Sequence, residues 1–159
     1  MKKDSVKVLL IYPPTGFITN YNTPTGLLYI ATVLQKAGYQ VVLVDCSVEP
    51  NYQEMLDREI IDTDLLAVYA LSVHIRYLLP ELTRLKKRNP TMKIIWGGPH
   101  AMLFPEQTAR SEYADVVATC EGEDLMVELA NQIDAGSWDM QNVQGIPFKT
   151  NRAVVSNTP

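Results

Sequence analysis

The sequence predicts an α/β protein of the flavodoxin-like class, with a doubly wound sheet of five parallel strands in spatial order 2-1-3-4-5. Strand-like and helix-like segments alternate along the 159 residues, and the strand-like segments are almost continuously apolar. Parallel strands have this composition when helices cover both faces of their sheet. At this length, five such units are typical of the doubly wound sheet.

The expected strands are short runs rich in aliphatic residues. They are Val6–Tyr12, Gln40–Cys46, Asp64–Ser72, Lys93–Gly98 and Ala114–Cys120. Helical patterns follow each of them. They are Thr25–Gly38, Pro50–Ile60, Pro80–Arg88, Phe104–Glu112 and Glu123–Gly136. Gly38 is expected to cap the first helix, and Pro80 is expected in the first turn of the third, where a proline ring is tolerated.

We expect residues 1–140 to form one domain. The remaining segment, 141–159, reads as a small hairpin turning at "KTNR" or as the start of a linker towards a further, C-terminal domain. Its hydrophobic content is too low for a domain of its own.

Charge, hydropathy and cysteine content argue against several classes of protein. Net charge is −4, and the one basic cluster, Arg84–Pro90, falls where a helix should end and complements its dipole, so nucleic-acid binding is not expected. No apolar run approaches the length of a membrane span and no signal peptide is evident, which predicts a cytoplasmic protein without membrane contact. Cys46 and Cys120 are isolated and expected at opposite sheet edges, roughly 19 Å apart, so neither a disulfide nor a metal site is expected.

Ligands of doubly wound sheets bind beyond the carboxyl ends of the strands, here centred on the crevice between the first and third strands. The segments at those ends lack the phosphorylatable aspartate of a response regulator, the GxGxxG of a dinucleotide site, the Ser/Thr-rich loop of a flavodoxin and the GxSxG of a hydrolase. What remains is a rim of glycines, prolines and backbone amides. Such a rim suits a large, flat, neutral ligand, because bare backbone can approach it closely.

The glycine pair Gly97 and Gly98 has two interpretations at this stage. It either lets a ligand approach the sheet, or it forms a tight strand-to-helix turn in which Gly98 adopts a positive φ. Glu121 and Glu123 are equally open, since carboxylates at a helix start are stabilised by the helix dipole without any ligand.

Four segments together resemble the N-terminal cobalamin-binding domain of cobalamin-dependent radical SAM enzymes. They are "PPTGFITNYNTPTGLLYIATVLQKAGYQVVLVD", "IIWGGPHAMLFPE", "ADVVATCEGEDLMVEL" and "VQGIPFKTN", and the similarity extends from Val6 to about Ser156. The resemblance implies a corrinoid that the domain presents to a following barrel. That barrel would cleave S-adenosylmethionine at an iron–sulfur cluster held by CxxxCxxC, for methyl transfer or related radical chemistry.

Carried over by motif, the resemblance implicates the residues after four strands. They are Pro13, Pro14 and Thr15; Ser72, Val73 and His74; Gly97, Gly98, Pro99 and His100; and Glu121, Gly122 and Glu123. Tyr21, in the long loop after the first strand, is a further candidate that could cover the ligand. Two features depart from related families: the DxHxxG signature, whose histidine ligates cobalt, is absent, and "TC" precedes "EGE" where a glycine is common.

We therefore expect base-off cobalamin. Its nucleotide tail should enter beside Pro13–Thr15 and Ser72–His74, and its corrin should lie over Gly97–His100 and Glu121–Glu123. The cobalt should have no histidine ligand from this chain, since His74 and His100 read as structural or corrin-contacting groups. With two cysteines the chain alone should catalyse nothing. Two alternatives stay open: a degenerate scaffold domain without cofactor, and a free-standing corrinoid carrier, which the missing DxHxxG disfavours.

Overall fold

In the described part of the chain the sheet has seven strands, in the order β2-β1-β3-β4-β5-β6-β7. The computed structural model describes residues 5–15, 23–141, 143, 146–149 and 154–156. The strands are β1 Lys7–Tyr12, β2 Gln40–Asp45, β3 Leu65–Tyr69, β4 Lys93–Gly97, β5 Val116–Val117, β6 Pro147–Lys149 and β7 Val154–Ser156. The first five pair in parallel, so the predicted order 2-1-3-4-5 is confirmed.

The predicted count of five strands is wrong, because the C-terminal segment extends the sheet. β6 pairs antiparallel with β5, and β7 pairs antiparallel with β6. The pairing satisfies the outer edge of β5, which would otherwise present unpaired backbone groups. Cys120 was expected at a sheet edge, but it follows β5, which lies inside the seven-stranded sheet. Cys46 is buried, Cys120 is exposed, and both are free thiols.

The helices are α1 Thr25–Lys36, α2 Tyr52–Glu59, α3 Ile75–Arg88, α4 Pro99–Leu103, α5 Pro105–Ala109 and α6 Gly122–Asp134, with 3₁₀ turns η1 Ile60–Asp62 and η2 Ser72–His74. Gly38 adopts a positive φ of 93° just after α1, as expected for a C-terminal cap. None of the helices in the described ranges combines the length and the apolar character that crossing a bilayer requires.

Two helix predictions are wrong in detail. α3 begins at Ile75, well before Pro80, because η2 leads directly into it and its buried leucines hold the longer helix against the sheet. Of the expected helix Phe104–Glu112 only Pro105–Ala109 (α5) is helical, and a further short helix, α4, precedes it. The two helices break at Phe104, whose φ of −130° is extended, since a residue that precedes a proline is disfavoured in the helical region.

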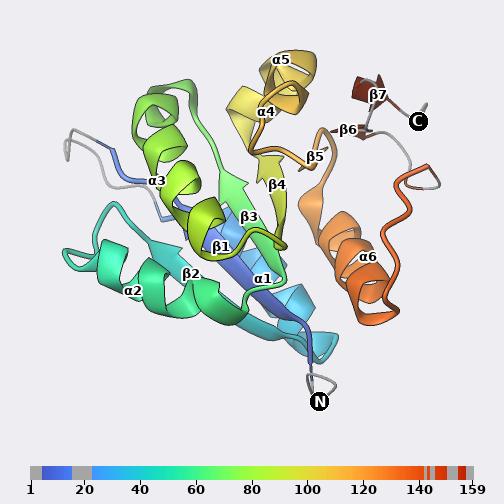
Figure 1. Cartoon of the computed structure of the whole chain (residues 1–159), viewed down its shortest axis with the longest axis horizontal. Helices are drawn as coiled ribbons and strands as arrows, with labels where there is room; N and C mark the ends of the chain where they lie inside the picture. Colours follow the sequence, from blue (N-terminus) through green and yellow to red (C-terminus); the bar gives the residue numbers. More distant parts are fainter. Residues whose placement is uncertain (1–4, 16–22, 142, 144–145, 150–153, 157–159) are drawn as a thin grey trace.

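The helices cover the sheet in two layers (Figure 1). α1 and α6 pack beside each other on one face, over a cluster that includes Leu10, Leu34 and Leu129. α2 and α3 cover the other face, over a cluster that includes Leu9, Leu82 and Ile94, and residues of α4 and α5 join this second cluster. The carboxyl ends of β3 and β4 point toward α4 and α5, at the top of Figure 1.

The basic cluster of α3 is paired within the fold. Arg84 and Arg88 form ion pairs with Asp57 of α2, and the Lys86 ammonium donates to the Met92 carbonyl at 2.5 Å. The local pairing explains why positive residues gather at the end of α3 without reference to a ligand.

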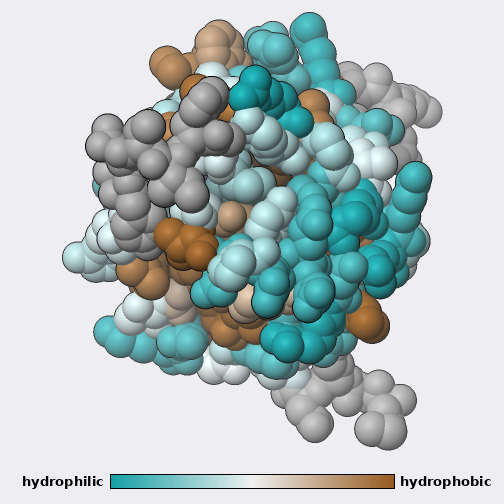
Figure 2. Space-filling view, turned by 90° about the vertical axis from the view of Figure 1, so that its left-hand side faces the viewer, coloured by the Kyte–Doolittle hydropathy of each residue, from teal (hydrophilic) through white to brown (hydrophobic). Residues whose placement is uncertain are grey.

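Figure 2 shows the side of the molecule on the left of Figure 1, which is largely hydrophilic with small, separate hydrophobic patches.

Candidate functional site

A cavity of about 520 Å³ lies at the carboxyl ends of β3, β4 and β5, between the starts of α1 and α6. Apolar and small residues dominate its lining. The lining residues are Gly26, Leu27, Ile30, Ala67, Val68, Tyr69, Ile95, Gly97, Gly98, Met102, Ala118, Cys120, Glu121, Gly122, Glu123 and Met126. Its size falls within the range of about 300–1,000 Å³ that small-molecule sites occupy.

The floor of the cavity forms where three neighbouring strands present small residues to the same face of the sheet. Side chains alternate along a strand, so Gly97 lies on the same face of β4 as Ile95, which belongs to the α1/α6 cluster. Ala67 of β3 and Ala118, just after β5, lie on this face too. A Cβ atom added to Gly97 would meet Ala118 Cβ at 3.8 Å and the Val68 carbonyl at 4.0 Å, which are ordinary contacts. A larger side chain at Gly97 would extend into the cavity.

Gly98 serves a different purpose from Gly97. Its φ is +86°, and a Cβ atom there would lie 3.0 Å from both the nitrogen and the oxygen of the Ala70 backbone. Both backbone polar groups of Ala70 are hydrogen-bonded: its N–H donates to the Gly97 carbonyl, and its carbonyl accepts the His100 N–H, each at 2.9 Å. The tight-turn interpretation is therefore confirmed for Gly98, whereas Gly97 has room for a Cβ atom and its role in ligand approach stays a prediction. Pro99 follows as the first residue of α4.

The mouth of the cavity contains the "EGE" motif. Gly122 starts α6, and a Cβ atom there would come within 2.9 Å of Ile30 Cδ1, so the absence of a side chain lets α6 approach α1. Glu121 is exposed and Glu123 is half-buried. Both residues line the cavity where β5 leads into α6.

Ser72 and His100, which follow different strands, are brought together by the structure. Ser72 Oγ and His100 Nδ1 are 3.0 Å apart, and the His100 ring contacts Phe104 with centroids 5.2 Å apart. Partial burial lowers the pKa of His100, so its imidazole is neutral at pH 7. The pair joins the β3–η2 and β4–α4 connections beside the cavity.

His74 is a structural residue. Its side chain is fully buried, its Nδ1 accepts the Leu71 N–H at 3.3 Å, and its ring meets Tyr12 edge-on with centroids 5.4 Å apart. Burial lowers the pKa of His74, and the backbone of Tyr69 offsets this only in part. Val73 beside it is 65% exposed.

The other predicted residues lie outside the cavity lining. Pro13 is buried after β1, while Pro14 and Thr15 are half-buried. Tyr21 lies outside the described residues. The cavity therefore extends from β3 to β5, whereas the sequence argument centred the ligand on the crevice between β1 and β3.

Sequence reasoning missed the walls of the cavity. Leu27 and Ile30 of α1 and Met126 of α6 read as ordinary core positions of amphipathic helices. The usable signal was the recurrence of small residues on one face of adjacent strands, at Ala67, Gly97 and Ala118. Recognising it requires the strand register, which pairs Ala67 with Ile95 and Tyr69 with Gly97.

A hydrophobic rim surrounds the same edge of the sheet. We define it by six exposed apolar residues on α1, η2, α4 and the α4–α5 junction: Leu28, Tyr29, Val73, Met102, Leu103 and Phe104. Met102 also lines the cavity, so the rim meets the cavity at this residue.

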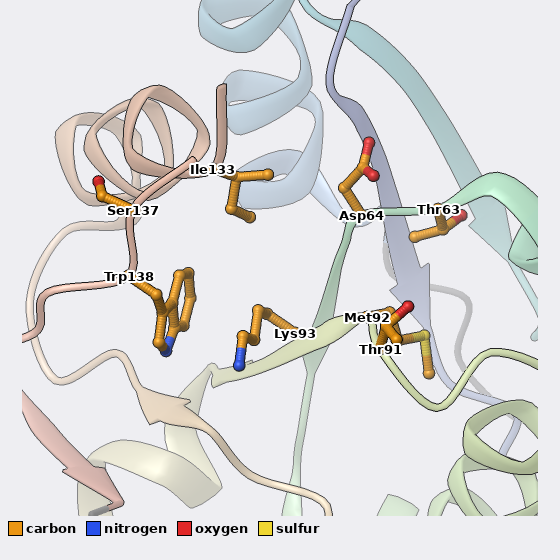
Figure 3. A pocket seen from close by; sticks show the side chains of 8 residues that line it. All are labelled: Thr63, Asp64, Thr91, Met92, Lys93, Ile133, Ser137 and Trp138. Carbon is orange, nitrogen blue, oxygen red and sulfur yellow. The ribbon is translucent and has the colours of Figure 1, made fainter. Parts of the chain in front are cut away.

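A second, smaller cavity of about 280 Å³ lies at the opposite, amino end of the strands. Figure 3 shows Trp138 and Lys93 side by side in it, and the Lys93 ammonium lies 5.2 Å from the centre of the Trp138 ring. Asp64 at its border accepts the Lys7 N–H at 2.8 Å. This cavity is far from the glycine motifs and from the edge at which doubly wound sheets bind ligands.

A flavodoxin-like sheet with an apolar cavity at its carboxyl edge is typical of domains that bind a small molecule or cofactor. The chain belongs to the B12-binding domain family, whose model, "B12 binding domain", matches residues 16–130. The predicted resemblance is thereby confirmed. Among the described residues, no group of three or more histidine, cysteine or carboxylate side chains is placed to hold a metal ion.

Named relatives agree with this assignment. The chain is 26% identical to an uncharacterized methyltransferase of Pyrococcus horikoshii and 25% identical to the anaerobic magnesium-protoporphyrin IX monomethyl ester cyclase of Rubrivivax gelatinosus, in each case over 97% of this chain. It spans 35% and 30% of their lengths, about a third. The fold is shared with the radical S-adenosylmethionine methyltransferase TsrM from Kitasatospora setae, solved with cobalamin and a [4Fe-4S] cluster. The TM-score is 0.82 at 20% identity, over 98% of this chain and 31% of that one.

Proposed function

We propose that this domain holds a base-off corrinoid at the carboxyl edge of its sheet and presents it to a radical SAM catalytic domain of a longer protein. The observation that carries the proposal is the apolar cavity behind Gly97. Support comes from the B12-binding family match and from relatives about three times as long, among them a methyltransferase and a cyclase. The iron–sulfur cluster and S-adenosylmethionine belong to the catalytic domain in this proposal.

The chemistry of the cavity decides which part of a corrinoid enters it. The rim of a corrin carries amide side chains, and burying an amide without a hydrogen-bond partner is costly. The aromatic base at the end of the nucleotide tail is flat and largely apolar, so it suits a floor of Ala67, Gly97 and Ala118. A Cβ-free position at Gly97 leaves the space that the base needs.

The corrin then lies outside the cavity, over the carboxyl edge. Its amides would find Ser72, His100, Glu121 and Glu123 there, together with the backbone of the β4–α4 turn. A base enclosed between α1 and α6 cannot also reach the cobalt, so the cofactor is base-off. This placement moves the tail from the β1–β3 crevice to the β3–β5 cavity.

Neither histidine serves as a cobalt ligand in this proposal. His74 is fully buried and does not line the cavity, and His100 is engaged by Ser72 through Nδ1. When bound, cobalamin supplies a cobalt centre that can carry a methyl group. The residues of this chain bind and orient the cofactor and keep its tail out of water. The hydrophobic rim is the surface that faces the catalytic domain.

The test is reconstitution of the purified chain with hydroxocobalamin, followed by desalting and a visible spectrum. We expect the wild-type chain to retain a base-off spectrum and Gly97→Val to retain no chromophore, because valine fills the space behind the motif. Lys93→Val is the matched control. It places valine on the same face of β4 at the amino end and should retain the cofactor. Thermal unfolding of all three chains separates lost binding from lost folding, and a wild-type chain without chromophore would refute the proposal.

A further inference from the structure

We propose that the cavity selects corrinoids by their nucleotide base, taking a benzimidazole and rejecting a purine. This inference rests on the proposed function and specifies the class of cofactor that the site accepts. It follows from where the polar groups of the cavity lie.

Three of the four polar side chains that line the cavity, those of Cys120, Glu121 and Glu123, are grouped where β5 leads into α6, whereas the fourth, Tyr69, is paired with Gly97 in the register. Cys120 and Glu121 are exposed, and Glu123 is half-buried at the first turn of α6. Tyr69 is half-buried, and its ring is stacked on Tyr12 with centroids 5.5 Å apart. Seven other lining residues are aliphatic, methionine or glycine: Leu27, Ile30, Ala67, Ile95, Gly97, Ala118 and Met126.

The backbone polar groups of the floor are also already hydrogen-bonded within the protein. The Gly97 carbonyl accepts Ala70 N–H at 2.9 Å, and the Trp96 carbonyl accepts Ala118 N–H at 2.7 Å. β3 and β4 pair in parallel from Leu65 to Tyr69, so the strand amides at this level are used within the sheet. A base lying on this floor finds apolar surface and few free hydrogen-bond partners.

Two kinds of base fare differently in such a space. A dimethylbenzimidazole exposes one free ring nitrogen, and its methyl groups gain from contact with Leu27, Ile30 and Met126. Adenine brings an exocyclic amino group and additional ring nitrogens, which lose their water on entry. Leaving one or two such groups unpaired weakens binding by about tenfold to a hundredfold.

The experiment is equilibrium dialysis of the full 159-residue chain against three probes: cobalamin, the corrinoid that carries adenine as its base, and cobinamide, which lacks the nucleotide. We expect cobalamin to bind at least about tenfold more tightly than the adenine form, by the cost of the unpaired groups. Cobinamide should also bind more weakly than cobalamin, because it leaves the cavity unfilled.

A pair of alanine variants tests whether the floor is responsible. Ala118→Ser adds a hydroxyl to the floor at little cost in volume and should reduce the preference for cobalamin over the adenine form. Ala114→Ser is the matched control. Ala114 is also buried, but it belongs to the cluster on the α2/α3 face and does not line the cavity, so the preference should stay unchanged.

The outcomes separate the two proposals. Equal affinity for cobalamin and the adenine form, or equal affinity for cobalamin and cobinamide, overturns the base selection while corrinoid binding stands. A wild-type chain that binds none of the three probes overturns both. A preference that Ala114→Ser alters as much as Ala118→Ser also refutes selection by the floor.

Discussion

The two faces of the sheet are made by the same strands but are packed differently. On the α2/α3 face, large side chains such as Leu66, Leu82 and Ile94 are fully buried, and the Trp96 indole donates to the Tyr113 carbonyl at 2.9 Å. On the α1/α6 face, β3 and β4 contribute the small residues Ala67 and Gly97, Ala118 follows β5, and a cavity remains. β4 shows the contrast within one strand, since Ile94 and Trp96 point to the filled face, whereas Ile95 and Gly97 point to the hollow one.

This difference separates stability from binding. The filled face follows the rule that interiors are close-packed, so it should supply much of the free energy of folding. The hollow end of the other face gives up packing contacts, which a bound ligand could restore. Substitutions on the two faces should therefore differ in which property they change.

The largest expected effect is on stability, from Leu82→Ala on the filled face. Leu82 is fully buried against the sheet, and its truncation removes transfer free energy and leaves a cavity. We expect the free energy of unfolding to fall by about 2–5 kcal/mol in urea denaturation. Leu103→Ala is the control: Leu103 is 70% exposed, and its loss should change stability by no more than about 0.5 kcal/mol. Similar losses for the two variants would contradict the comparison.

Neighbouring glycines should give effects of opposite sign. Gly98→Ala places a Cβ atom 3.0 Å from the Ala70 backbone at a φ of +86°, and should cost about 1–3 kcal/mol of stability. Gly97→Ala adds a methyl group with ordinary contacts in a strand, and should raise stability by about 0.4–1 kcal/mol by restricting the unfolded chain. Thermal and urea unfolding of the two single variants measure both values. Destabilisation by Gly97→Ala equal to that of Gly98→Ala would show that both glycines serve the turn.

The sequence was sufficient for the order of the parallel strands, because apolar runs, helix caps and strand-end motifs all report local preferences. It offered a C-terminal hairpin as one alternative, which the antiparallel pairing of β6 with β7 agrees with, but it was insufficient for the addition of this hairpin to the sheet, since that depends on a long-range contact between Val116 and Phe148. The start of α3 was misplaced because tertiary packing of Leu78, Leu82 and Leu85 outweighed the local cost of Pro80.

The sequence predicted at which edge of the sheet the candidate site lies, but it did not predict the cavity. The motifs marked Gly97, Gly98 and 121–123, which line the cavity. They could not distinguish the two glycines, because the distinction depends on the position of Ala70 across the turn. Ala67 and Ala118 are inconspicuous when each strand is considered alone, and they matter because the fold puts them on the same face as Gly97, with Ala118 beside it and Ala67 opposite Ile95.

A smaller effect is expected from the two histidines as the pH falls. Burial lowers the pKa of His74 and of His100 below the ordinary value of 6.5, so the unfolded chain binds protons more readily than the folded one. Their contribution to stability is therefore complete above pH 6.5 and is lost as the pH falls through the lowered folded-state pKa values.

Urea denaturation across a pH series measures this decline. The interval between 6.5 and 4.5 isolates the histidines from carboxylates such as Glu59, whose pKa is lowered from 4.5 by hydrogen bonds from Lys7 and Arg58. The double variant His74→Gln/His100→Gln should show a flatter profile in this interval. Stability that rises on acidification from neutral pH would contradict the prediction.

The smallest expected effect is a difference in chemical labelling rate between the two cysteines. One belongs to the filled face and the other lines the cavity. Cys46 belongs to the filled face, where burial, reinforced by the nearby charges of Glu81 and Asp45, raises the pKa of its thiol to about 12. Cys120 is exposed at the entrance of the cavity, although partial desolvation raises the pKa of its thiol as well. Since the thiolate is the reactive form, iodoacetamide at mildly alkaline pH should modify Cys120 and leave Cys46 intact in the folded chain, as read by mass spectrometry. Cys120→Ser should remain unlabelled until urea unfolds it.

If a corrinoid tail enters past Cys120, saturating cyanocobalamin should slow the modification of Cys120 and leave that of Cys46 unchanged. Equal labelling of the two cysteines in the native chain would contradict the packing difference, whereas an unaltered Cys120 rate with cofactor bound would move the ligand away from the β5 side of the cavity.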